Sequence, residues 1–295
     1  MQKERKIAFV GLGSMGLPMA ENLLRAGHAV AGFDTRPAAV EALAGAGGQR
    51  PADLAAACAD AALLVLMVVN IDQARAVLFQ AGGLAALPPA ARICLMATCP
   101  PQDVAALARE VAAAGRELID CPVSGGVVGA RAGTLTIMVG APAASYQAVA
   151  PVLRAMGDRL YHCGPEPGQG AMVKAINQLL CGVHLAAAAE ALALGEKTGI
   201  DGATLLEIVS GSAASSWMLK DRGPRMLRRN PEVTSAVDIF VKDLGIALSA
   251  GRGAAMGLPL TAAAHQMFLA ESGAGHGLAD DSQVIAAYRR LNGIG

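Results

Sequence analysis

The 295-residue sequence has few aromatic residues and no excess of charge of either sign. Aromatic residues make up 3% of the chain, which leaves few rings on which nucleic-acid bases could stack. Lysine and arginine together number 24, as do aspartate and glutamate, so no net field draws the chain to a polyanion or an acidic membrane. We therefore expect neither a nucleic-acid partner nor a membrane partner.

Long apolar runs and metal-binding patterns are also lacking. The charged N-terminus leads into an apolar run (residues 7–10) that is too short for a signal sequence or a membrane span, and Glu190 interrupts the alanine-rich stretch 185–194. The six cysteines form no C-x-x-C pair, and the five histidines are scattered. We therefore expect free thiols, a cytoplasmic location and no metal.

The N-terminal segment carries the most informative pattern. A strand-like run, Lys6–Val10, leads into Gly11-Leu12-Gly13-Ser14-Met15-Gly16, and a helical pattern follows. In such a G-x-G-x-x-G turn the first glycine permits the tight bend, the second lets the backbone approach a pyrophosphate, and the third allows close helix packing. The segment Gly11–Gly16, Ser14 and Met15 included, therefore predicts a dinucleotide site at the start of a helix.

The acid that follows bears on the choice of dinucleotide. Asp34 closes a second strand pattern (29–33), where its carboxylate can accept hydrogen bonds from ribose hydroxyls and repel a 2′-phosphate. Arg36 could pair with that phosphate, although a solvated loop arginine is the more common explanation. We expect NAD, with NADP less likely.

The first half of the chain alternates strand and helix patterns at the rhythm of a doubly wound parallel sheet. Strand patterns lie at 62–69, 92–97, 116–120, 135–139 and 159–162, and the region from about residue 170 onward has only helical patterns. The sequence predicts a dinucleotide-binding α/β domain over residues 1–164 and an all-helical domain over residues 165–295. A long helix from about 170 to 198 is expected to form the spine of the second domain.

Three segments could carry chemistry. The first, Asp120-Cys121-Pro122-Val123-Ser124-Gly125-Gly126, follows a strand and offers a hydroxyl and exposed backbone N–H groups, a plausible cradle for a carboxylate. A glycine turn without a ligand is an equally good interpretation. Another of the three, the segment Asp238 to Leu244, contains Lys242, which could reach cofactor or substrate. It also contains Phe240, which could pack near the nicotinamide. An ordinary surface Lys–Asp pair is the alternative interpretation of this segment.

The second segment lies in the long helix. Lys174, Asn177 and Gln178 fall on one stripe of an otherwise apolar helix, where a cation and two amides would not face a core without partners. A lysine buried beside a cofactor can serve as a general base if its pKa is lowered toward neutrality. A lysine reaching solvent at a domain interface is the alternative. His184, farther along the helix, is expected to be an interior histidine, and Trp217 a core residue.

Together these segments resemble the β-hydroxyacid dehydrogenase family, which includes 3-hydroxyisobutyrate dehydrogenase and tartronate semialdehyde reductase. The resemblance rests on five motifs in order: Gly11–Gly16, Asp120–Gly126, Gly133–Gly140, Gly168–Gln178 and Phe240–Leu244. It implies an N-terminal Rossmann domain, an all-α C-terminal domain, a homodimer or homotetramer and a lysine general base.

The resemblance also assigns roles to single residues. Lys174 matches the family's catalytic lysine. Residues matching its substrate side are Ser124, Gly125, Gly126, Asn177, Gln178, Lys242 and Asp243. Residues matching its cofactor side, beyond the glycine turn and Asp34, are Met67, Val68, Val69, Asn70, Thr98, Phe240 and Lys242. Two departures are Ala97-Thr98, where many members carry Ser-Thr, and Gln178, where hydroxyisobutyrate-type members carry asparagine.

The expected function is therefore NAD-dependent oxidation of a small hydroxy acid. Flanking segments such as 67–70, 216–218 and 238–245 are most similar to family members that oxidise L-threonate, which is the best single substrate. Tartronate semialdehyde reduction and 3-hydroxyisobutyrate oxidation are alternatives, and a non-catalytic dinucleotide-binding scaffold is a more distant one.

Overall fold

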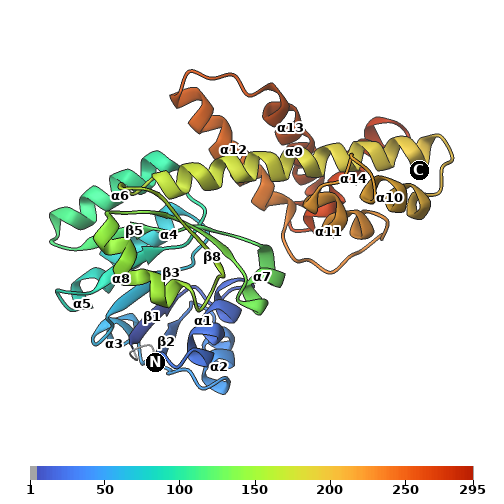
Figure 1. Cartoon of the computed structure of the whole chain (residues 1–295). Helices are drawn as coiled ribbons and strands as arrows, with labels where there is room; N and C mark the ends of the chain where they lie inside the picture. The colour runs from blue at the N-terminus through green and yellow to red at the C-terminus, as the bar shows by residue number, and fades with distance from the viewer. Residues whose placement is uncertain (1–4, 295) are drawn as a thin grey trace. The chain divides into compact units, whose positions relative to one another are not determined.

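The chain folds as two compact units, Met1–Lys174 and Ala175–Gly295, in a computed structural model that describes residues 5–294 (Figure 1). The predicted domain boundary after residue 164 lies at the end of the last strand, ten residues before the end of the first unit. That boundary stays a prediction.

The first unit is built on one mixed sheet in the order β2-β1-β3-β4-β5-β7-β6, with β8 paired to β7. Its strands are β1 (Lys6–Val10), β2 (Ala29–Phe33), β3 (Leu63–Leu66), β4 (Arg92–Leu95), β5 (Glu117–Asp120), β6 (Val123–Ser124), β7 (Thr136–Gly140) and β8 (Arg159–Gly164). The strands β1 to β5 pair in parallel, whereas β7 runs antiparallel to β5 and β6. The predicted α/β fold is confirmed, and the sheet is mixed rather than purely parallel because β7 runs antiparallel to β5.

Helices cover both faces of this sheet (Figure 1). They are α1 (Gly16–Arg25), α2 (Pro37–Gly45), α3 (Leu54–Cys58), α4 (Ile71–Arg75), η1 (Ala76–Gln80), α5 (Gly83–Ala86), α6 (Pro101–Ala113), α7 (Gly126–Ala132) and α8 (Ala143–Leu153). Successive side chains of a strand point to opposite faces. Phe9 of β1 accordingly packs in one core with Met19 of α1, while Val10 packs in the other with Leu107 of α6. The continuous apolar strands of the sequence reflect burial on both faces.

The described part of the second unit consists of helices and one isolated β-bridge, between Ala236 and Asp280. Helix α9 (Gln169–Lys197) begins in the first unit and continues into the second. The others are α10 (Gly202–Ser210), α11 (Trp217–Met226), α12 (Val237–Gly253), α13 (Pro259–Glu271), η2 (Ser272–His276), η3 (Asp281–Gln283) and α14 (Val284–Leu291). Leu185, Leu244 and Phe268 are buried in the core of this unit.

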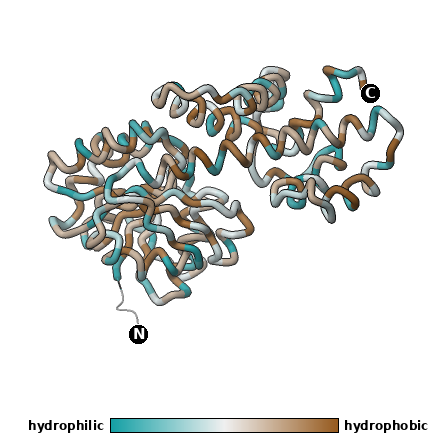
Figure 2. Tube along the Cα trace, turned by 45° about the horizontal axis from the view of Figure 1, so that its top comes forward, coloured by the Kyte–Doolittle hydropathy of each residue, from teal (hydrophilic) through white to brown (hydrophobic). Residues whose placement is uncertain are grey.

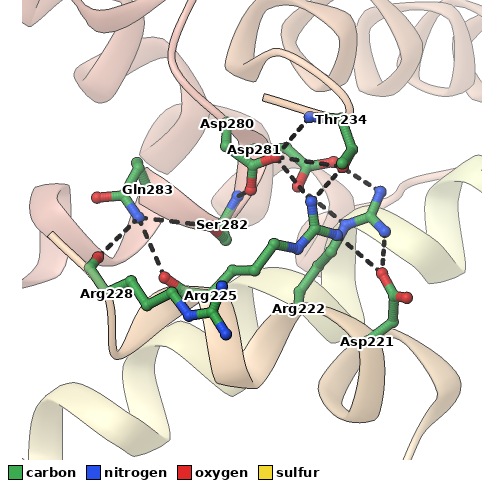
Figure 3. Close-up of polar contacts among 9 residues, drawn as sticks. All are labelled: Asp221, Arg222, Arg225, Arg228, Thr234, Asp280, Asp281, Ser282 and Gln283. Carbon is green, nitrogen blue, oxygen red and sulfur yellow. Dashed lines mark hydrogen bonds and ion pairs between the residues drawn. The ribbon is translucent and has the colours of Figure 1, made fainter. Parts of the chain in front are cut away.

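A buried ionic network joins α11 to η3 (Figure 3). The Arg222 guanidinium donates to both carboxylate oxygens of Asp281, from Nε at 2.9 Å and from Nη2 at 3.0 Å. Arg225 Nη1 donates to Asp280 Oδ2 at 2.7 Å, and the same oxygen accepts from the backbone N–H of Thr234 at 3.0 Å. We call these four charged residues the Arg–Asp cluster; it joins α11 and the loop before α12 to the start of η3.

Within residues 5–294, α9 is the one helix long and apolar enough to cross a membrane by length and composition. Figure 2 shows hydrophobic residues, in brown, along much of this helix. Half of the apolar 18-residue stretch of this helix is buried inside the structure, and core helices of soluble proteins are buried too. The helix is therefore weak evidence for a membrane span.

Candidate active site

The glycine turn after β1 has the geometry that a dinucleotide requires. Gly11 has a φ of +94°, and a Cβ there would collide with the carbonyl oxygen of Met67. A Cβ on Gly16 would collide with the carbonyl oxygen of Gly11, so the start of α1 packs directly on the turn. At Gly13, by contrast, the nearest atom to a Cβ would be Arg36 Nη2 at 3.9 Å, which leaves open space beside the backbone.

The start of α1 is suited to an anion. Among the described residues no side chain caps this helix, and its first turn carries no acid. Its N-terminal amides and the positive end of its dipole therefore remain for a phosphate. Ser14 is exposed and Met15 half-buried at this helix start. The turn fits a dinucleotide pyrophosphate.

Asp34 is held beside the turn by hydrogen bonds. Its Oδ2 accepts from the backbone N–H of Leu12 at 2.8 Å, and its Oδ1 accepts from the backbone N–H and the Nε of Arg36 at 2.9 and 3.1 Å. Burial raises the pKa of Asp34, but the hydrogen bonds from Arg36 and Leu12 outweigh it and hold the pKa below its ordinary value. Asp34 is therefore ionised at neutral pH.

The interpretation of Arg36 as simply solvated is incomplete. Its side chain is 63% exposed, yet it forms an ion pair with Asp34 and donates from Nη2 to the carbonyl oxygen of Leu12 at 3.2 Å. The short Asp-x-Arg spacing was the available signal for this pairing. Arg36 is therefore paired with Asp34, the carboxylate predicted to bind the ribose.

The other predicted cofactor-side residues of the first unit lie at the carboxyl ends of β3 and β4, where parallel sheets bind ligands. Asn70 caps α4: its Oδ1 accepts from the backbone N–H of Gln73 at 2.9 Å. The Gln73 side chain in turn accepts from the backbone N–H of Val69, also at 2.9 Å. Met67, Val68 and Thr98 are half-buried. Gln73, which sequence reasoning missed, fixes the loop 67–70.

The predicted carboxylate loop follows β5 and β6. Ser124 ends β6, and Gly125 and Gly126 have positive φ values of +131° and +61°. Helix α7 begins directly at Gly126, so the predicted loop is shorter than the sequence indicated. All three residues are half-buried. The positive φ values explain why glycine occupies both positions.

Lys174 is buried, with 5% of its surface exposed, in the second turn of α9. Asn177 and Gln178 lie three and four residues farther along the same helix and therefore on the same side of it. Asn177 is half-buried and Gln178 is buried. A buried lysine on this helix is the feature that sequence reasoning singled out.

In the second unit, Asp243 joins two predicted substrate-side residues. Its Oδ2 accepts from Gln178 Nε2 at 2.6 Å, and its Oδ1 accepts from Lys242 Nζ at 2.7 Å. Asn177 Nδ2 donates to Gln178 Oε1 at 3.0 Å. Asp243 is 2% exposed. We call these four residues the Asp243 cluster; a surface Lys–Asp pair does not describe it.

Three other residues differ from simple expectation or find a structural explanation. Phe240 is buried and stacks on Phe268, with ring centroids 5.0 Å apart, so packing in the second unit accounts for its burial. His184 is exposed, which corrects its interpretation as interior. Trp217 is 57% exposed, with the Arg222 guanidinium 5.9 Å from its ring centroid, so it is not a core residue. Among residues 5–294 no group of three His, Cys, Asp or Glu side chains is placed to hold a metal ion.

A glycine turn that fits a pyrophosphate, with an ionised aspartate beside it, defines a dinucleotide-binding protein of the doubly wound class. Two family models match the chain: the NAD binding domain of 6-phosphogluconate dehydrogenase over residues 6–164, and the NAD-binding domain of NADP-dependent 3-hydroxyisobutyrate dehydrogenase over residues 168–288. The chain belongs to the 3-hydroxyisobutyrate dehydrogenase-like family of β-hydroxyacid dehydrogenases. It is an NAD-dependent oxidoreductase that acts on the CH–OH group of a hydroxy acid.

Similar proteins match over nearly the whole chain. A protein from Cupriavidus necator named L-threonate dehydrogenase is 45% identical over 288 residues, 96% of each chain. A 3-hydroxyisobutyrate dehydrogenase from Pseudomonas aeruginosa is 38% identical and covers 96% of this chain and 98% of its own. The crystal structure of a 3-hydroxyisobutyrate dehydrogenase from Salmonella typhimurium has a TM-score of 0.90 and 37% identity, covering 95% of this chain and 98% of that one.

Proposed function

We propose that the protein oxidises L-threonate with NAD and that Lys174 is its general base. The observation that carries the chemistry is the burial of Lys174 on α9, one turn before Asn177 and Gln178. The choice of substrate is supported by relatives named L-threonate dehydrogenase at 45% and 40% identity. It is also supported by Gln178, where hydroxyisobutyrate-type members carry asparagine.

Separate groups of residues would bind the cofactor, bind the substrate carboxylate and accept the proton. The turn Gly11–Gly16 and Asp34 would hold NAD, with Met67–Asn70 and Thr98 at its border; bound NAD supplies the hydride acceptor. Ser124 and the backbone N–H groups of Gly125 and Gly126 would hold the substrate carboxylate. Oxidation of a CH–OH carbon releases the hydroxyl proton, which the Lys174 amine accepts. Burial disfavours the charged form of a lysine, which favours the neutral amine that a general base needs before it accepts a proton.

The Asp243 cluster would orient the rest of the substrate. Asp243 holds the Gln178 amide and the Lys242 ammonium through its two carboxylate oxygens. An amide and an ammonium fixed in this way present hydrogen-bond donors suited to the hydroxyls of a polyol acid. Phe240 would support the cofactor side through the packing of α12 on Phe268.

The test is a turnover assay with matched lysine variants. Purified protein is mixed with NAD or NADP and a panel of L- and D-threonate, D-erythronate, 3-hydroxyisobutyrate, glycerate and serine, and absorbance of the reduced nicotinamide is followed. We expect turnover on L-threonate with NAD. Lys174→Ala should lower kcat by roughly 10²–10⁴-fold while NAD still binds. Lys197→Ala, an exposed lysine on the same helix, should leave kcat unchanged.

The outcomes separate the alternatives. Turnover confined to 3-hydroxyisobutyrate would favour the second candidate, which the 38% identical relative from Pseudomonas aeruginosa supports. A parallel assay with tartronate semialdehyde and NADH measures the reductive direction, and turnover in that assay alone would favour a semialdehyde reductase. Near-normal turnover in Lys174→Ala would remove the lysine from the mechanism. Absence of turnover by the wild-type protein in both the oxidative and the reductive assay would favour a non-catalytic dinucleotide-binding scaffold.

We also propose that the protein is cytoplasmic and forms a homodimer or homotetramer. Large exposed apolar side chains on the second unit support self-association: Leu260 is 70% exposed, Leu278 83% and Leu291 73%. Light scattering coupled to size-exclusion chromatography measures the assembly directly. A monomer at micromolar concentration would contradict this part of the proposal.

A further inference from the structure

A buried aspartate from the sheet caps the helix that carries Lys174. Asp120 is the last residue of β5 and is fully buried. Its Oδ2 accepts from the backbone N–H of Gly168 at 2.9 Å and from that of Ala171 at 2.7 Å. These two residues bracket the first turn of α9, so the N-terminus of the helix is capped by a residue almost fifty positions earlier in the chain.

The helix start also packs on β7 without room for movement. A Cβ on Gly170 would collide with the carbonyl oxygen of Met138 and lie 3.0 Å from the backbone nitrogen of Gly140. A Cβ on Gly140 would lie 2.8 Å from the backbone nitrogen of Gly170 and 3.3 Å from Asp120 Oδ2. Glycine at both positions therefore brings the helix backbone against the strand and the carboxyl group.

The two segments that meet at Asp120 both lead to predicted site residues. Lys174 lies three residues beyond Ala171, which is about 4.5 Å along a helix. Ser124 lies four residues beyond Asp120, at the end of β6. We propose that Asp120 is a positioning residue, which sets the Lys174 amine relative to the Ser124–Gly126 loop by fixing the first turn of α9 to the end of β5. The inference rests on the proposed function for the role of Lys174 as base.

Stability of the helix end alone does not call for an acid here. Asp120 Oδ1 has no hydrogen-bond partner among the described residues and is buried, which is costly for a carboxyl group. The thiols of Cys121 and Cys163 interact electrostatically with Asp120. An asparagine or serine caps a helix equally well without a buried acid. What the position requires is an oxygen acceptor held rigidly at the end of β5.

The experiment compares variants that remove, keep or move this acceptor. Asp120→Ala removes it, Asp120→Asn keeps it, and Asp120→Glu moves it by one methylene. Asp201→Ala is the matched control, because Asp201 caps α10 by accepting from the backbone N–H of Thr204 at 2.8 Å. Two quantities are measured: kcat and KM with NAD and L-threonate, and the rate at which acetic anhydride acetylates Lys174, with Lys197 as the internal reference.

Displacing a catalytic base by about 1 Å can lower the reaction rate by on the order of 100-fold. We expect Asp120→Ala and Asp120→Glu to lower kcat by roughly 10–100-fold with KM for NAD nearly unchanged. Both should change the acetylation rate of Lys174 relative to Lys197. Asp120→Asn should stay close to wild type in both measurements, and so should Asp201→Ala. If Asp120→Ala does not fold, Asp120→Glu carries the comparison.

Two results overturn the inference: wild-type kcat in Asp120→Ala or Asp120→Glu, or a lowered kcat with an unchanged Lys174 acetylation rate. The labelling does not depend on turnover. If the wild-type protein oxidises no acid on the panel, the proposed function fails, while a changed labelling rate in Asp120→Ala still supports the positioning role. Unchanged labelling in that case overturns it.

Discussion

Asp34 and Arg36 show how two adjacent side chains divide the control of cofactor choice. The Asp34 carboxylate faces the glycine turn through its hydrogen bond to Leu12, and the Arg36 guanidinium covers the same carboxylate. The acid repels a 2′-phosphate, whereas a guanidinium without an acid beside it would bind that phosphate strongly. We therefore expect the ion pair to restrain Arg36 from binding the 2′-phosphate of NADP.

Asp34→Asn should shift the preference toward NADP. The asparagine removes the charge that repels the phosphate and that pairs with Arg36, and it keeps an oxygen that can accept from Leu12. We expect the ratio of kcat/KM for NADP to that for NAD to rise by roughly 10–100-fold. The control is Asp34→Asn with Arg36→Ala, in which the gain with NADP should vanish. A gain that survives in the double variant would assign the preference to another residue.

At the scale of elements, much of the first unit could be predicted because its signals are local. Strand β3 is apolar throughout, and β1 and β4 are apolar after their first residues, Lys6 and Arg92. The turn after β1 has the glycine spacing that its close contact with Met67 requires. The cap that Asp120 provides to α9 could not be predicted, because Asp120 lies 48 residues before Gly168 and 51 before Ala171. The same holds for the bond between Gln178 and Asp243. Motifs marked these residues, but only the fold pairs them.

The buried Asp120 carboxyl group that caps α9 should also make the free energy of unfolding depend on pH. Burial raises the pKa of Asp120 from 3.8 to about 7, although backbone N–H groups at the start of α9 lower it. The folded state therefore binds this proton more tightly than the unfolded state. The stabilisation that the bound proton gives to the folded state is complete below the pKa of Asp120 in the unfolded chain, about 4. This stabilisation is lost as pH rises through the pKa of Asp120 in the folded protein, about 7.

Urea denaturation of the wild type and of Asp120→Asn at pH 5, 6, 7 and 8 tests this expectation. The free energy of unfolding of the wild type, relative to the variant, should fall with rising pH, by at most about 4 kcal/mol. Asp201→Asn is the control, because hydrogen bonds from Thr204 lower the pKa of Asp201. The difference in free energy of unfolding between this variant and the wild type should therefore stay constant from pH 5 to 8 and change only at lower pH. A difference for Asp120→Asn that grows with pH would show that the folded protein prefers the ionised form.

At the scale of the whole molecule, each unit carries its own stabilising interior. The first has two apolar cores, one on each face of its sheet, and the second has one helical core together with the Arg–Asp cluster (Figure 3). Arg222 is 9% exposed, and Asp281 is fully buried. Burial raises the pKa of Asp281 despite the opposing effect of Arg222, so the carboxylate depends on this partner.

Removing Arg222 should therefore destabilise the second unit and leave nucleotide binding by the first intact. Arg222→Leu leaves Asp281 buried without its bidentate partner, a change that typically costs about 3–5 kcal/mol. Hydrogen exchange measured by mass spectrometry should show lost protection in residues 175–294 and wild-type protection in β1 to β5. Arg289→Ala, which breaks the more exposed pair with Glu196, should cost less than about 1 kcal/mol. Combining Arg222→Leu with Asp281→Leu should recover much of the loss, because the unpaired charge is then gone. Equal loss of protection in both units would instead mean that the chain unfolds as a single cooperative body and that the Arg–Asp cluster stabilises all of it.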